Sequence, residues 1–378
     1  MMPDPIKTES PEPEVDTLPG GTHKRNPKEK PEARTKEKQP PKVPRNIVPI
    51  IMGLAAILLL APAPLMAQLQ CGVSIGTTYS DNVFQLSPYD LSRWDNSHPN
   101  LGYVNTTDDL SLNASFDLAW PLRYQWWKIT PSVTANLSQN YANPDKQRQD
   151  ALFRLRVDRH YWNFTALYGY FPQNYVRSYI DADGTGNLEK YSYERNLWRG
   201  DLNLKPFKNT TLSLQGRYEQ YYYNQYWTEF DANATTLGFG ARHAFPAFSL
   251  GASYRYRIHD NHRHGIRDGS YESNRYSGNI RLAATPLDND KPGSPTFQPE
   301  LALSYEQRYF QSNDPWYGGR ADHIYNTEAT VNIGFGPRWN LKLDYSHAYR
   351  NIESPVEEVR RAREYSENKV SATVKYSF

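Results

Sequence analysis

The sequence predicts an all-β fold, a transmembrane up-and-down antiparallel β-barrel of about 14 strands with a disordered N-terminal leader. Three observations predict it. From residue 71 onward, apolar and polar residues alternate in runs that have the two-residue period of a strand. Short turns and long polar loops alternate between these runs. Aromatic residues make up 14% of a chain whose mean hydropathy is only −0.80, so apolar side chains are spread thinly and regularly.

The N-terminal segment differs in composition from the rest of the chain. Residues 1–45 are rich in Pro, Lys and Glu and contain almost no apolar residues. Such a segment cannot bury enough surface to offset the entropy lost on ordering, so we expect it to be disordered. Residues 46–67 are apolar, follow Lys42 and Arg45, and end on the small residue Ala67, which are features of a cleaved signal peptide.

A retained membrane helix is the alternative for this apolar segment, because its length approaches that needed to span a bilayer. However, Pro49, Pro62 and Pro64 interrupt the run, and the strand pattern follows directly. We therefore favour an export signal, followed by one barrel domain at residues 68–378.

The charge balance and the cysteine count exclude two classes of protein. Lys and Arg total 43 and Asp and Glu total 41, and beyond the signal-like segment the two signs balance, so we expect no nucleic-acid partner. The one cysteine, Cys71, excludes an internal disulfide framework.

The strand pattern recurs along the whole barrel segment. In the last run, Val370, Val374, Tyr376 and Phe378 share one face, while Lys, Ser and Thr occupy the other. Each run is about 10–14 residues long, enough to cross a membrane at a tilt. The apolar faces of the predicted strands lie within residues 73–79, 110–120, 127–137, 153–157, 164–170, 198–204, 212–222, 235–241, 248–258, 276–284, 301–309, 327–335, 339–349 and 370–378.

The connections between the strands predict two different rims. Short turns on one rim and long loops on the other are typical of an up-and-down barrel. Short turns are expected near 121–125, 160–163, 205–209, 244–248 and 336–338, with a longer one at 286–296. Long polar loops are expected near 82–107, 172–191, 259–273, 310–324 and 350–366, with two shorter ones near 140–148 and 224–229.

The outward faces favour a membrane barrel over the alternative, a soluble sandwich. Their middles are aliphatic and their ends are aromatic, as expected where rings lie at the two membrane interfaces. Because lipid offers no hydrogen-bond partners, the sheet must close, so the last strand should pair with the first near residues 71–81. The aromatic residues near the strand ends include Trp120, Trp127, Tyr218, Tyr222, Tyr256, Trp339 and Tyr349.

The C-terminal residues Val370, Val374, Tyr376 and Phe378 resemble the assembly signal of Gram-negative outer-membrane β-barrel proteins, which end on Phe after alternating apolar residues. The resemblance implies recognition by the barrel assembly machinery. It also implies a location in the outer membrane, in contact with lipid and lipopolysaccharide. A short segment after the first strand, 79–83, is similar to the opening of porin-like barrel families.

The inward faces carry many charges of both signs, which indicates a hydrated lumen. Two interpretations stay open: a charged wall that selects solutes, or cross-strand salt bridges that brace the wall. A mild basic excess would favour anions. The candidate lumen-lining selectivity residues are Arg154, Arg156, Arg199, Arg217, Arg255, Arg257, Arg281, Glu300 and Glu306.

Other candidate chemistry is weak. His259, His262 and His264 cluster in one expected loop without the spacing of a metal site. Residues 181–187 faintly resemble a calcium loop, but Ser192 stands where the glutamate should be. There is no G-x-S-x-G motif. We therefore expect no enzyme activity, no metal and no cofactor.

Together these features predict an outer-membrane porin-like channel for the passive diffusion of small hydrophilic solutes. One alternative is a structural or surface-binding barrel whose long outer loops recognise a polysaccharide or another partner. The Tyr-rich segment 219–227 would suit stacking on sugars. A polymer export pore is the other alternative.

Overall fold

A computed structural model describes residues 69–180, 186–263, 268–288, 293–314 and 316–378. The predicted leader (1–45) and signal-like segment (46–67) lie outside the described residues. Among the residues that are described, no helix is both long enough and apolar enough to cross a bilayer.

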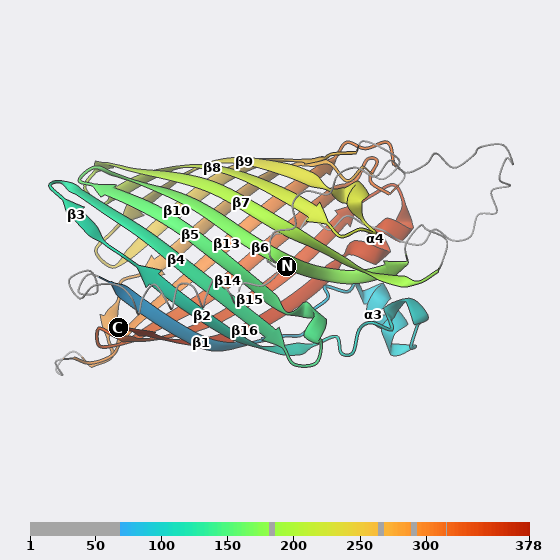
Figure 1. Cartoon of the computed structure of the whole chain (residues 1–378), viewed down its shortest axis with the longest axis horizontal. Coiled ribbons are helices and arrows are strands. Elements are labelled where there is room, and N and C mark those ends of the chain that lie inside the picture. Colours follow the sequence, from blue (N-terminus) through green and yellow to red (C-terminus); the bar gives the residue numbers. More distant parts are fainter. Residues whose placement is uncertain (1–68, 181–185, 264–267, 289–292, 315) are drawn as a thin grey trace, which may run out of the picture.

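The fold is a closed antiparallel barrel of 14 long strands, as predicted. Figure 1 shows the strands inclined to the long axis of the barrel. Two short strands, β3 (Leu122–Tyr124) and β12 (Thr285–Pro286), extend two of the turns. The long strands are β1 (Gln70–Ser80), β2 (Asp109–Ala119), β4 (Trp127–Asn140), β5 (Arg148–Arg159), β6 (Trp162–Ile180), β7 (Leu188–Phe207), β8 (Thr210–Tyr223), β9 (Ala232–Ala244), β10 (Phe248–Asn261), β11 (Tyr271–Leu282), β13 (Thr296–Phe310), β14 (Ala321–Phe335), β15 (Trp339–Glu353) and β16 (Tyr365–Ser377).

The barrel closes between its first and last strands, as the sequence predicted. Ile75 of β1 lies opposite Ala114 of β2 on one side and Val374 of β16 on the other. At the end of the seam, the backbone N–H of Phe378 donates to the carbonyl oxygen of Cys71 at 2.9 Å. Closure therefore pairs the two strands that would otherwise be the open edges of the sheet.

Side chains alternate between the two faces of the wall, because the strand period is two. Outward-facing Ile75 and Leu237 are 58% and 62% exposed. The last strand follows the same rule: Val370, Val374 and Phe378 are exposed, and the Tyr376 ring lies 4.7 Å from that of Phe378. The predicted face of the C-terminal segment is therefore confirmed.

The two rims differ as the sequence predicted. The short turns and the C-terminus lie at one end, which we call the short-turn rim (Figure 1). The long-loop rim at the other end carries helix α3 (Pro88–Asp95) and helix α4 (Glu357–Arg363) (Figure 1). Ser87 caps α3, accepting a hydrogen bond from the Asp90 backbone N–H at 3.0 Å, and Pro88 occupies the first turn.

One predicted loop was wrong. Residues 172–191 do not form a long polar loop, because β6 and β7 run on through most of it as strands of 19 and 20 residues. Register shifts between Phe171 and Asn174 and between Tyr175 and Arg177 break the strict alternation there, which hid the strand pattern. These two strands also exceed the predicted strand length.

At the long-loop rim, two apolar clusters pack the outer segments against the strands, and together we call them the cap. One joins the α3 loop to β6 and comprises Phe84, Leu86, Leu101, Val104 and Tyr175. The other fills the lumen side of β7, β8 and β9 with buried rings. Its members are Val176, Tyr191, Tyr193, Tyr221, Tyr223, Trp227, Phe230, Ala232 and Ala234.

Candidate functional site

The lumen contains a polar cavity of about 610 Å³, which we call the lumen cavity. Most of its lining comes from inward-facing positions on strands β5 to β11, β13 and β14. Asn163 and Thr211, which each follow a short turn, place it in the half of the barrel nearer the short-turn rim. Guanidinium, carboxylate, amide and hydroxyl groups line it, so its wall offers hydrogen bonds to water and to polar solutes.

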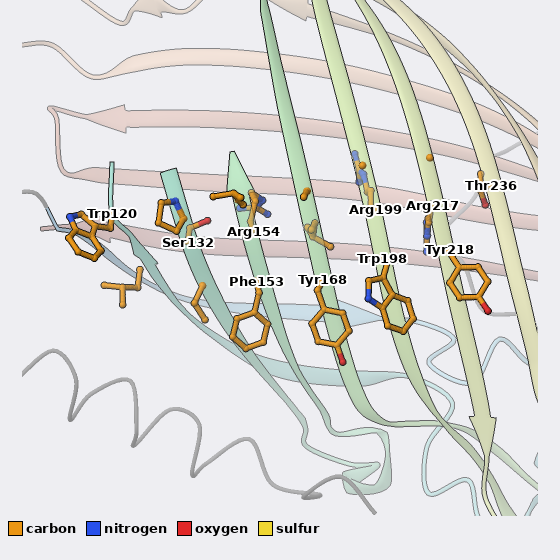
Figure 2. Close-up of a pocket in the computed structure, with 18 of the residues that line it drawn as sticks. Trp120, Ser132, Phe153, Arg154, Tyr168, Trp198, Arg199, Arg217, Tyr218 and Thr236 are labelled. Carbon is orange, nitrogen blue, oxygen red and sulfur yellow. The ribbon is translucent and has the colours of Figure 1, made fainter. Parts of the chain in front are cut away.

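The candidate selectivity residues face the lumen side of the wall. Figure 2 shows Arg154, Arg199 and Arg217 on the side of the sheet opposite to the rings of Phe153 and Trp198. Within the set, the residues that line the lumen cavity are Arg156, Arg199, Arg255 and Glu300.

The other candidate residues occupy different positions. Arg281 forms an ion pair with Glu300 at 2.5 Å, at the edge of the lumen cavity. Arg217, Arg257 and Glu306 lie deeper, toward the long-loop rim.

Many lumen charges form ion pairs with the next inward residue of the same strand. Arg156 pairs with Asp158 at 2.7 Å, and Arg199 pairs with Asp201 at 2.8 Å. One intervening residue faces outward, so the two charged groups point to the same side. Further pairs of this type are Arg217–Glu219, Arg308–Glu306, Lys342–Asp344 and Lys369–Glu367. Arg320, which lies just before β14, pairs with Asp322 at the same spacing.

The outer half of the lumen is packed rather than open. Glu219 is fully buried and lies 2.6 Å from Arg217, 2.8 Å from Arg257 and 3.4 Å from Arg195. Asp322 is also fully buried, and it accepts from Arg320 and Arg350.

This packing corrects the prediction that the charged wall faces a hydrated lumen along its whole length. The charged wall faces water only in the half near the short-turn rim, where Arg156 and Arg199 are exposed. In the outer half, Arg257 and Glu306 are buried among other side chains.

Several charged lumen residues were missed from the sequence. Arg242 lines the lumen cavity, and Arg275 lines it opposite Arg255. Both fall one step beyond a predicted apolar run, and extending the alternation by that step would have found them. Arg350 was missed because it falls in the predicted loop 350–366, and Arg195 because it lies between the predicted loop 172–191 and the predicted run 198–204.

The Tyr-rich segment 219–227 is not a surface for stacking on sugars. Tyr221, Tyr223 and Trp227 are buried in the aromatic cluster of the cap. The Trp227 indole N–H donates to the Lys190 carbonyl at 3.2 Å.

The expected histidine loop is partly strand. His259 lies on β10, is buried, and stacks on Tyr271 with ring centroids 4.9 Å apart. Its neighbour His264 lies outside the described residues, as do Asp181, Asp183 and Gly184 of the calcium-like segment. Within the described part of the chain, no three His, Cys, Asp or Glu side chains gather where they could hold a metal.

An apolar hollow lies on the outward face of the wall. It measures about 900 Å³ and spans strands β2 to β9. Figure 2 shows Phe153, Tyr168, Trp198 and Tyr218 projecting on its side of the sheet. Gly200 and Gly216 lie opposite each other there and add no side chain. Such a surface suits acyl chains, so we place the candidate site in the lumen instead.

Comparisons with known proteins give structural likeness at very low sequence identity. No family model and no curated protein matches the chain. The CymD monoaromatic hydrocarbon channel has a TM-score of 0.44 at 10% identity, covering 86% of this chain and 93% of that one. A bacterial polysaccharide outer membrane secretin has a TM-score of 0.42 at 7% identity, covering 81% and 98%. The anion-selective porin from Comamonas acidovorans has a TM-score of 0.38 at 9% identity, covering 82% and 98%.

Proposed function

We propose that the chain is an outer-membrane porin-like channel for the passive diffusion of small hydrophilic solutes. The observation that carries the proposal is the contrast between the two faces of the closed wall. Outward, leucine, isoleucine and aromatic side chains are exposed on strand after strand. Inward, a polar cavity of about 610 Å³ lies in the half of the lumen near the short-turn rim. A soluble protein does not expose so much contiguous apolar surface, whereas a membrane barrel requires it.

The orientation follows from the two rims. In outer-membrane barrels the short turns face the periplasm and the long loops face outward. The lumen cavity therefore faces the periplasm, and the cap with α3 and α4 faces the exterior. Lipopolysaccharide would contact the long-loop rim, and the exposed segment ending in Phe378 would be presented to the barrel assembly machinery.

The packed outer half of the lumen is the region that limits the passage of solutes. Solutes meet buried ion pairs around Glu219 and Asp322 before they reach the exterior. Small solutes alone fit such a constriction, and their passage requires these side chains to move apart.

Single-channel recording of the refolded chain in a planar bilayer tests the proposal. We expect stable, ohmic conductance steps that are small for a barrel of this size. Heat-modifiable migration on a denaturing gel serves as the control for folding. A barrel that is folded by this control but conducts nothing would overturn the channel.

A second candidate is a closed barrel that binds a partner through the cap. One observation favours it: the outer loops are folded into a packed structure with its own apolar cluster. On its surface Tyr89 lies between two cations, with its ring 5.3 Å from the Arg93 guanidinium and 4.7 Å from that of Arg361. If the barrel does not conduct, binding of acidic polysaccharides by wild type and by a Tyr89→Ala variant, measured by calorimetry, tests this function.

A further inference from the structure

A small pocket in the outer half of the lumen is lined mainly by arginines. Its volume is about 30 Å³, and residues of strands β8, β9, β10, β11 and β13 line it. A site for one water needs roughly 10–15 Å³, so the pocket has room for a monatomic anion. The lining residues, which define the arginine pocket, are Arg217, Thr236, Arg255, Arg257, Tyr271, Ser273, Arg275, Glu306 and Arg308.

The lining contains five arginines and one carboxylate, that of Glu306. Glu306 accepts from Arg308 Nε at 2.7 Å, and its other oxygen lies 3.9 Å from Arg275. The nearby Glu219 is shared by Arg217 and Arg257 and also by Arg195, which lies outside the pocket. Each of these two glutamates therefore contacts more than one arginine, which gathers several guanidinium groups around the pocket.

Two of the arginines face each other directly across strands. Arg255 of β10 lies opposite Arg275 of β11 in the register. Like charges in this position repel. Both residues also line the lumen cavity, so they stand where the two spaces meet. An anion that arrives from the lumen cavity would meet this pair first and would relieve the repulsion between them.

The pocket also contains buried donors that lack a partner. Thr236 is 5% exposed, and its hydroxyl makes no hydrogen bond within the described residues. The Nε of Arg275 is likewise buried and without a partner there. Thr236 lies opposite Arg217 on one side and Arg257 on the other. A buried orphan donor is rare in folded proteins and points to a missing acceptor.

We propose that the arginine pocket binds a small inorganic anion of about the size of chloride, held by guanidinium groups and the Thr236 hydroxyl. The anion supplies an acceptor to the buried Thr236 hydroxyl and to Arg275 Nε. It also makes the channel prefer anions, and this last consequence rests on the proposed function.

Chloride binding to the refolded full chain in detergent tests the site without requiring conductance. The readout is the excess ³⁵Cl NMR linewidth during a chloride titration, with bromide as competitor. We expect saturable broadening that bromide removes. Thr236→Val should weaken chloride binding roughly tenfold, because a hydrogen bond to a charged group is lost. Arg275→Gln should reduce it further.

Matched controls separate this pocket from general arginine effects. Thr235→Val alters the neighbouring hydroxyl, which is exposed on the outward face, and Arg123→Gln alters an exposed arginine in a short turn. Both should bind chloride as the wild type does. Absence of saturable broadening in the folded wild type would overturn the site, and so would equal binding by Thr236→Val and Thr235→Val. Chloride binding in a barrel that does not conduct would leave the site standing and remove the channel.

Discussion

At the scale of single residues, the lumen face depends on ion pairs that differ greatly in burial. Arg156 and Asp158 form their pair at the wet end of the lumen, where the arginine side chain is 49% exposed. Glu219 forms its pairs at the packed end, where it is fully buried. Removal of one partner should therefore cost little at the exposed end, where solvent screens the pair, and much at the packed end, where it leaves a buried charge without its partner.

Substitution of Glu219 by Gln should destabilise the barrel by about 3–5 kcal/mol, because three arginines would lose a buried counter-charge. Unfolding by urea in lipid vesicles, followed by heat-modifiable migration, measures the loss. The matched control is Asp158→Asn, which breaks an exposed pair and should cost at most about 1 kcal/mol. If the two variants lost the same free energy of unfolding, burial would not determine how much each ion pair contributes.

Gly76 lies where β1 approaches β16 too closely for a side chain. A Cβ at this position would lie 2.6 Å from the Ala372 carbonyl oxygen and 2.9 Å from the Thr373 Cα. Gly76→Ala should therefore destabilise the barrel by about 1–3 kcal/mol through overpacking at the closing seam. The same urea measurement checks it. Gly216→Ala is the control, because nothing lies within 4 Å of the added Cβ.

At the scale of elements, the connection between β8 and β9 is held by a buried carboxyl group, that of Asp231. The short helix η3 (Thr228–Phe230) ends at Asp231, whose carboxylate accepts from the Tyr223 backbone N–H at 2.6 Å. Burial raises the pKa of Asp231 to about 6, and the Tyr223 hydrogen bond opposes the rise. The folded loop therefore favours the protonated carboxyl.

This raised pKa predicts a pH-dependent cap. The stability that Asp231 contributes is fully present below its ordinary pKa of 3.8, and it is lost as the pH rises through about 6. Hydrogen exchange of residues 224–231, corrected for intrinsic rates, should show falling protection between these values. Asp231→Asn keeps an acceptor for Tyr223 and should abolish the dependence. A variant with the same pH slope as the wild type would contradict this assignment.

The β6–β7 hairpin extends beyond the barrel wall at the long-loop rim. Its register shifts release the chain from strict alternation near Tyr175. That ring then packs against Phe84 of the α3 loop, with centroids 6.4 Å apart. The hairpin thus supports the cap from one side, which a short turn at this point could not do.

At the scale of the whole molecule, the two halves of the lumen have different properties. The half near the short-turn rim contains the lumen cavity, and the outer half contains buried ion pairs and rings. The barrel is therefore asymmetric along its axis. We expect conductance to be limited by the outer half and to respond to changes there more than to changes near the turns.

Assembly in the cell should depend on the exposed C-terminal residue. Phe378 is 71% exposed on the outward face, so its side chain contributes little packing within the barrel. Phe378→Ser should lower the amount of folded barrel in the outer membrane of an expressing Gram-negative cell while leaving refolding in detergent unchanged. Ser377→Ala, one step away, is the control. If both variants assemble like the wild type, the segment is not an assembly signal.

The sequence by itself determined the class of fold, the number of strands and the face on which most side chains lie. These depend on a local rule, since alternation with a period of two can be read from neighbours in the chain. Ile75 and Leu237 therefore face outward, and Arg156 and Arg199 face the lumen, as predicted. The basic and acidic residues at alternate positions, such as those at 199 and 201, are visible in the same way.

The tertiary structure alone decided which half of the lumen is open and which charges are buried. Arg255 meets Arg275, and Glu219 meets Arg257, through the register of different strands. The cap forms because segments distant in sequence pack together, as Phe84 of the α3 loop does with Tyr175 of β6. Register and loop packing depend on contacts between residues far apart in the chain, and no local period carries that information.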